Sequence, residues 1–208
     1  MTSRPRLAAA FLALLLLPAE AAAHSPSVVD RAASSPDDAV VLEDPGLSRA
    51  IGALLAEPGE IDWYRMDLKA GDPLVVGMTA PDASGAVAAT FVLLGPGLPE
   101  ASLSGDAVAM LADRVGVEGG VAFEPAADPP REVHGGLGFI NYGTLQLEAP
   151  EGGTYWIAVS AVDPTETGKY VLAPGFREEF GVDAIGGMID LISFFDEPAP
   201  HGTPGAEQ

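Results

Sequence analysis

The sequence predicts a mainly β protein, an antiparallel β-sandwich that ends in a C-terminal helix. Residues 61–68 and 74–80 alternate apolar and polar side chains with period two, which is typical of half-buried strands. The same alternation returns at 145–149, 155–161 and 170–172. Between 177 and 196 the apolar residues recur at helical spacing instead, which indicates a helix packed on the sandwich.

Turn residues divide the chain into its predicted strands. Residues 40–42 and 49–55 are two short apolar segments on either side of a turn at 43–46. Segments 61–68 and 74–80 flank a turn at 70–73 and predict the clearest hairpin of the chain. A further strand is expected at 90–94, and the last three alternating segments predict a meander.

These patterns divide the chain into five parts. We expect a signal peptide at 1–23, a flexible lead-in at 24–39, a β-sandwich domain at 40–176, a helical segment at 177–196 and a disordered tail at 197–208. The sandwich contains an irregular insertion at 98–143, in which residues 107–115 fit either a helix or a strand. In the helical segment, Gly186 and Gly187 each weaken the helix by about 1 kcal/mol relative to alanine.

The first residues predict export. Arg4 and Arg6 precede an apolar run at 7–17, and small residues follow up to Ala23, as in a signal peptide cleaved near that position. The apolar run is far shorter than the roughly 20 residues of a transmembrane helix, so no transmembrane anchor is expected. There is no cysteine to carry a lipid or a disulfide. We therefore expect a protein located in the periplasm or outside the cell.

The charge excludes some classes of partner. The chain has 30 acidic and 10 basic residues, a formal net charge of −20. Such a surface repels phosphate backbones and anionic lipids, which argues against nucleic-acid and membrane-surface partners. It suits cations, a cationic partner or a salty medium.

Two segments resemble a known family of secreted domains. Residues 62–71, which begin Asp62-Trp63-Tyr64 and end in Ala70-Gly71, and residues 152–159, with Gly153-Thr154-Tyr155, look like the strands of bacterial pre-peptidase C-terminal domains. The resemblance covers roughly residues 47–173, with the middle third unmatched. It implies a jelly-roll-like β-sandwich that acts as an accessory or binding module, sometimes with calcium. The segments 167–173 and 177–180 also look like small uncharacterised secreted proteins built on this sandwich.

No reaction signature emerges from the sequence. His134 and the two glycines that follow it look like the oxyanion loop of esterases, but no serine lies in a Gly-x-Ser-x-Gly elbow. Thiol catalysis is excluded because the chain has no cysteine. We therefore assign no catalytic residue and expect a protein that is not an enzyme.

Two kinds of metal site remain open. Cleavage after Ala23 would leave His24 first, and its amine and ring could chelate copper if His134 or His201 supplied a second imidazole. Calcium would instead use acidic loops, either Asp163 and Glu166 with Thr167, or Glu118, Glu124 and Asp128.

A ligand site would use aromatic rings as stacking platforms. The candidates are Trp63, Tyr142 and Trp156, with Phe139 beside them. The sequence thus predicts a secreted, non-enzymatic binding or accessory module whose partner is a protein, peptide or glycan. The alternative is an exported metal-binding protein that uses calcium or copper.

Overall fold

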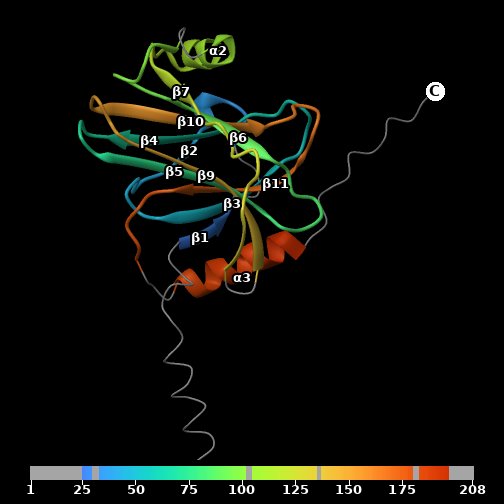
Figure 1. The fold of residues 1–208 in the computed structure, drawn as a ribbon. Helices are drawn as coiled ribbons and strands as arrows, with labels where there is room; N and C mark the ends of the chain where they lie inside the picture. The colour runs from blue at the N-terminus through green and yellow to red at the C-terminus, as the bar shows by residue number, and fades with distance from the viewer. Residues whose placement is uncertain (1–24, 30–32, 102–104, 135–136, 180–182, 197–208) are drawn as a thin grey trace, which may run out of the picture.

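Two β-sheets pack face to face, and each outer face carries a helix (Figure 1). The computed structural model describes residues 25–29, 33–101, 105–134, 137–179 and 183–196. The layers run from α2 (Asp106–Val115) through a five-stranded and a six-stranded sheet to α3 (Asp183–Asp196). The predicted β-sandwich with a C-terminal helix is confirmed.

Each sheet joins strands that are distant in the sequence. The six-stranded sheet has the order β1 (Ser25–Val28), β3 (Arg49–Leu55), β11 (Gly168–Pro174), β5 (Pro73–Pro81), β9 (Leu137–Glu148) and β8 (Arg131–His134). The five-stranded sheet has the order β2 (Val40–Val41), β4 (Asp62–Leu68), β10 (Gly153–Ala161), β6 (Ala89–Leu94) and β7 (Gly120–Ala122). Neighbouring strands are antiparallel, except that β1 runs parallel to β3 and β2 runs parallel to β4.

The main core lies between the two sheets. Alternate residues of each strand point inward, so that Tyr64, Met66 and Leu68 of β4 are buried together with Leu74 and Val76 of β5. The alternation of residues 61–68 and 74–80, which predicted half-buried strands, therefore matches these buried positions.

A buried polar chain links the two sheets through this core. The Tyr170 hydroxyl on β11 donates to Asp62 Oδ2 on β4 at 2.6 Å, and it lies 2.8 Å from the hydroxyl of Tyr64. Asp62 is fully buried, and its Oδ1 has no hydrogen-bond partner within the described structure. Burial raises the pKa of Asp62 to about 7, the Tyr170 hydrogen bond opposes this shift, and the charge of Glu60 adds to it.

The predicted strand pairings are wrong. Strands β4 and β5 do not form a hairpin, because the turn between them carries the chain from one sheet to the other. β9, β10 and β11 do not form a meander either: β9 and β11 both pair with β5, whereas β10 lies in the other sheet between β4 and β6. Apolar alternation shows which side of a strand faces the core, but a strand beside it and a strand facing it satisfy that pattern equally well.

Two segments are more regular than the sequence predicted. In the lead-in at 24–39, β1 pairs with β3 and residues 36–38 form a 3₁₀ turn. Main-chain hydrogen bonds pair β1 with β3, and such bonds require no alternation of apolar side chains in the sequence. Pro26 is compatible with the position of β1 at the edge of the sheet. The insertion at 98–143 contains α2, β7, β8 and half of β9. The segment 107–115 is helical, and Gly116 ends the helix in the left-handed conformation.

Helix α2 covers the outer face of the five-stranded sheet. Val108 and Ala112 of α2 are buried against Trp63, Leu94 and Ala158 of that sheet. This second apolar cluster explains why β4 and β10 carry a tryptophan on the side facing away from the main core.

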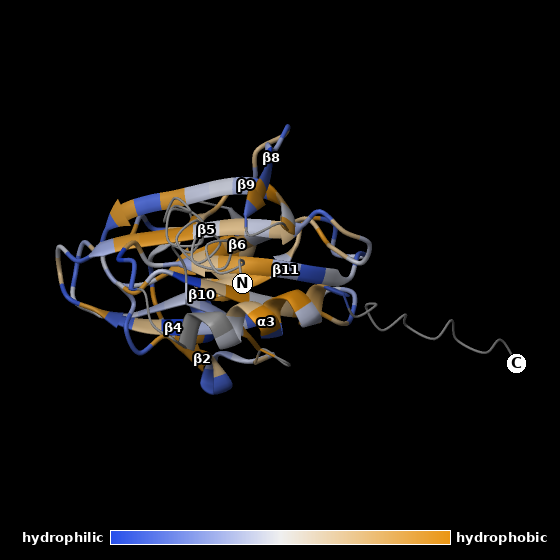
Figure 2. Cartoon of the chain, turned by 90° about the horizontal axis from the view of Figure 1, so that it is seen from below, coloured by the Kyte–Doolittle hydropathy of each residue, from blue (hydrophilic) through white to orange (hydrophobic). Residues whose placement is uncertain are grey.

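Helix α3 lies against the outer face of the six-stranded sheet (Figure 2) and approaches β1 closely (Figure 1). A Cβ atom at Gly187 would lie 2.0 Å from the carbonyl oxygen of Pro26, so only glycine permits this approach. Leu191 and Phe195 of α3 are buried with Val171 of β11.

A buried lysine holds the C-terminal end of α3. Lys169 on β11 is only 2% exposed, and its Nζ donates to the carbonyl oxygen of Phe194. The ammonium group also lies 4.8 Å from the centre of the Phe194 ring. A cation at this end of the helix satisfies a terminal carbonyl group and interacts favourably with the helix dipole.

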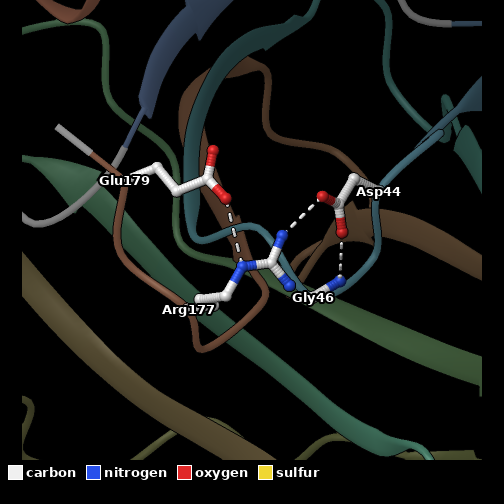
Figure 3. Close-up of polar contacts among 4 residues, drawn as sticks. All are labelled: Asp44, Gly46, Arg177 and Glu179. Atoms are coloured by element: carbon white, nitrogen blue, oxygen red, sulfur yellow. Dashed lines mark hydrogen bonds and ion pairs between the residues drawn. The ribbon is translucent and has the colours of Figure 1, made fainter. Parts of the chain in front are cut away.

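Arg177 fastens the chain between β11 and α3 to a turn near β3 (Figure 3). Its Nη2 donates to Asp44 Oδ2 at 2.6 Å, and its Nε donates to Glu179 at 3.2 Å. Asp44 Oδ1 also accepts from the Gly46 amide. This contact fixes the chain on its way to α3.

Within the described residues, no helix is long and apolar enough to cross a membrane. The proposed signal peptide at 1–23 and the predicted tail at 197–208 lie outside those residues.

The close approach of α3 gives a matched pair of substitutions. Gly186→Ala adds a methyl group where no atom lies within 4 Å, so helix propensity should raise the free energy of unfolding by up to about 1 kcal/mol. Gly187→Ala should lower it by about 1–3 kcal/mol, because the new methyl group displaces Pro26. Urea unfolding measures both, and equal effects at the two positions would contradict this packing.

Asp62 should make stability depend on pH. Its pKa rises from 3.8 to about 7 on folding, so the folded chain binds the proton more tightly between these values and stability falls as the pH rises through this window. Asp62→Asn removes this contribution. The stability of the variant relative to the wild type should therefore increase by up to about 4 kcal/mol from pH 4 to pH 8. Denaturant unfolding across that range tests this expectation, and a constant difference would contradict it.

Candidate ligand-binding groove

A groove of about 310 Å³ lies on the outer face of the six-stranded sheet, beside α3. Because side chains alternate along a strand, the residues of β5 between its buried core positions point outward and form part of the floor. β11 and β3 supply the rest of the floor, α3 supplies one wall, and the pair β8–β9 supplies the other. β8 is an edge strand that projects from the sheet (Figure 2).

The floor of the groove is apolar and built from small side chains. Val75 and Gly77 of β5 lie beside Val171 and Ala173 of β11. Met188 and Leu191 complete the surface from the α3 side. Because β5 and β11 are paired, the hydrogen bonds of the sheet fix the positions of these floor residues.

One end of the groove is polar. His134 Nε2 lies 2.9 Å from Glu132 Oε2, and Asn141 Nδ2 donates to Glu132 Oε1 at 3.0 Å. Asn141 Oδ1 in turn accepts from the Gly143 amide at 2.9 Å. Each of these side chains is thereby oriented by its neighbour.

A β-bulge allows this arrangement. The pairing of β5 with β9 shifts register so that Met78 faces Gly143 while Thr79 faces Asn141, which leaves Tyr142 without a partner on β5. Gly143 has a φ of +119°, a backbone conformation that favours glycine. The bulge lets Asn141 face the groove and Tyr142 pack against the main core.

The electrostatics of this end depend on Glu132. The hydrogen bond from His134 lowers the pKa of Glu132, the hydrogen bond from Asn141 lowers it further, and partial burial opposes both. The carboxylate is therefore ionised near neutral pH, and His134 Nε2 is the donor to it. In a neutral imidazole this leaves Nδ1 as an acceptor. The groove can thus hold an apolar body on its floor and a hydrogen-bonding group at its polar end.

A second hollow, of about 340 Å³, is polar and shallow. It is lined by residues 56–61 together with Ser34 and Arg114. Glu60 Oε2 there accepts hydrogen bonds from the amides of Ala56 and Glu57, so this carboxylate stabilises the turn in which it lies.

The structure describes one of the three histidines of the copper hypothesis. His134 ends β8, where it contacts Glu132 and Phe139. His24 and His201 lie outside the described residues. Ser25, the residue after His24, belongs to β1, and β1 and β8 are the two opposite edges of the six-stranded sheet.

The acidic residues of the calcium hypothesis do not form a cluster. Asp163 Oδ1 accepts from the Thr165 hydroxyl and amide, and these two bonds lower the pKa of Asp163. The Glu166 amide donates to the Asp163 carbonyl group in the same turn. In the part of the chain that the structure describes, no three His, Asp or Glu side chains lie close enough together to hold a metal ion.

The tryptophans predicted as stacking platforms lie under α2. Trp63 is fully buried, and the guanidinium group of Arg114 lies 5.1 Å from its ring centre. Trp156 is half-buried in the same cluster. Neither ring lines the groove, because α2 covers the sheet face that carries them. Tyr142 packs on the main core, and its partial burial raises its pKa.

Of the described site residues that the sequence predicted, His134 and Phe139 line the groove. The sequence analysis did not identify Glu132 or Asn141. The spacing of Glu132 and His134 gave one signal, since residues two apart on a strand share a face. Asn141 gave none, because its position depends on the bulge.

Comparison with known proteins adds no relative. The chain matches no protein-family model, and no curated protein matches it.

Removing His134 should change the titration of Glu132. His134→Ala deletes the largest cause of the depressed pKa, so the pKa of Glu132 should rise toward its ordinary value. Carbon-13 NMR of the side-chain carboxyl group during a pH titration measures the shift. Gln146→Ala, on the exposed side of β9, is the control and should leave the pKa of Glu132 unchanged. An unaltered titration in His134→Ala would contradict the hydrogen bond.

Proposed function

We propose that this protein is an exported, non-enzymatic binding module of the β-sandwich type, and that its ligand occupies the groove beside α3. The observation that carries the proposal is a largely apolar floor that ends in an oriented polar cluster, the Glu132–His134 pair with Asn141. Ligand sites in proteins commonly combine an apolar lining with a few placed polar groups, and their volumes range from about 300 to 1,000 Å³.

The wall formed by β8 and β9 supports this proposal. At this edge of the sheet, the strand pair β8–β9 carries Glu132, His134 and Phe139 to the groove. Glu132 and His134 remain 38% and 54% exposed in their side chains, so an incoming molecule can reach them.

The sequence supports the same proposal from another direction. The first 23 residues have the pattern of a signal peptide, and two strand segments resemble pre-peptidase C-terminal domains, which act as accessory or binding modules. Export and this resemblance both favour a protein that recognises a ligand outside the cytoplasm.

The groove can be tested with N-phenyl-1-naphthylamine, a neutral dye that fluoresces in apolar surroundings. We expect the dye to bind the wild-type protein and Thr144→Trp to weaken binding at least tenfold, because the indole ring would fill the groove. Gln146→Trp is the matched control, since residue 146 is exposed two positions further along β9 but does not line the groove. Fluorescence titration gives both affinities.

Thermal melting of each variant should first confirm that it is folded. Equal dye binding by the two tryptophan variants would overturn the groove as the ligand site.

A further inference from the structure

We propose that the groove is selective for a single-chain amphiphile with a protonated amine, whose chain lies on the floor and whose ammonium group lies at Glu132. This inference rests on the proposed function and specifies the chemical class of the ligand. It is argued from the shape of the floor, the hydrogen-bonding capacity of the polar end and the distribution of charge.

The floor suits a narrow apolar chain. The lining extends from Pro26 on one edge strand to His134 on the other, so the groove is elongated across the sheet. Gly77 and Ala173 are two of the small residues along this path, and bulkier side chains at these positions would narrow it. A chain placed here would leave water for a surface of valine, methionine and leucine.

The polar end suits a cation. Each carboxylate oxygen of Glu132 accepts one hydrogen bond within the protein, and each can accept another. Phe139 lies beside His134, with ring centres 6.0 Å apart, and its ring packs edge-on against Phe195 of α3, with ring centres 5.8 Å apart.

The surrounding charge disfavours an anionic head group. Of the described residues that line the groove, none is a lysine or an arginine. The nearby Arg131 is engaged with Asp82 at 2.5 Å, and Lys169 is buried under α3. The chain as a whole has a formal net charge of −20. A carboxylate head would therefore meet Glu132 and find no guanidinium or ammonium group at the groove.

The test compares three ten-carbon molecules that differ only in their head group. Decylamine, decanol and decanoate each compete with N-phenyl-1-naphthylamine at pH 7.5, where an alkylamine, like lysine, is protonated. At 0.15 M salt the Debye length is about 8 Å, which reduces the influence of distant charges. We expect decylamine to compete at a concentration about fivefold lower than decanol, and decanoate to compete least.

Two charge-removing variants separate the local carboxylate from the general charge. Glu132→Gln should reduce the advantage of decylamine over decanol to less than twofold. Glu148→Gln removes the same charge from an exposed position on β9 outside the groove, and should preserve the advantage. Glu132→Asp, which keeps the charge, should retain part of it. Unchanged melting temperatures confirm that each variant is folded.

The outcomes distinguish this inference from the proposed function. If Thr144→Trp weakens dye binding but the three head groups compete equally, the groove stands and the amine selectivity is overturned. If Glu132→Gln and Glu148→Gln reduce the advantage equally, the selectivity arises from overall charge and the inference again fails. If the dye is insensitive to Thr144→Trp, both proposals fail.

Discussion

The close packing of α3 on the six-stranded sheet is the contact on which the proposed site depends. Gly187 lets the helix touch the backbone of Pro26, and the buried ammonium group of Lys169 satisfies a carbonyl group at its C-terminal end. These two contacts hold the helix near both ends, over β1 and β11. The outward residues of β5 and the bulged part of β9 remain open beside it, and that open part of the sheet is the groove.

The interior of the sandwich is held by a different kind of contact. Since the chain has no cysteine, the two sheets are joined by packing and by the hydrogen-bonded chain from Asp62 through Tyr170 to Tyr64. A carboxylate buried in this way opposes folding when it is ionised, yet its geometry fixes the position of β11 opposite β4. The contribution of Asp62 to stability is then greatest where this group is protonated, whereas the amine selectivity proposed for the groove needs an ionised Glu132. Burial is the main cause of the raised pKa of Asp62, whereas hydrogen bonds are the main cause of the lowered pKa of Glu132.

The basic residues explain how so acidic a chain can still offer a selective site. Arg131 and Arg177 pair with acidic side chains, Arg114 stacks on Trp63, and Lys169 lies beneath α3. These cations serve the fold and do not line the groove. The described lining of the groove therefore presents one carboxylate, Glu132, and the proposed amine selectivity rests on the absence of lysine and arginine from that lining.

The sequence by itself determined the β-sandwich, the inward faces of its strands and the C-terminal helix, because side-chain periodicity reports local conformation and burial. It could not determine which strands pair, so the predicted hairpin of β4 with β5 was wrong. A strand shows the same alternation of apolar residues whether the next strand lies beside it in one sheet or faces it across the core. The sequence indicated His134 but not its partners. Glu132 became part of the site through the pairing of β8 with β9, and Asn141 through a bulge opposite Met78 and Thr79. Only the tertiary structure decided these positions, because contacts between distant strands leave no periodic signal in the chain.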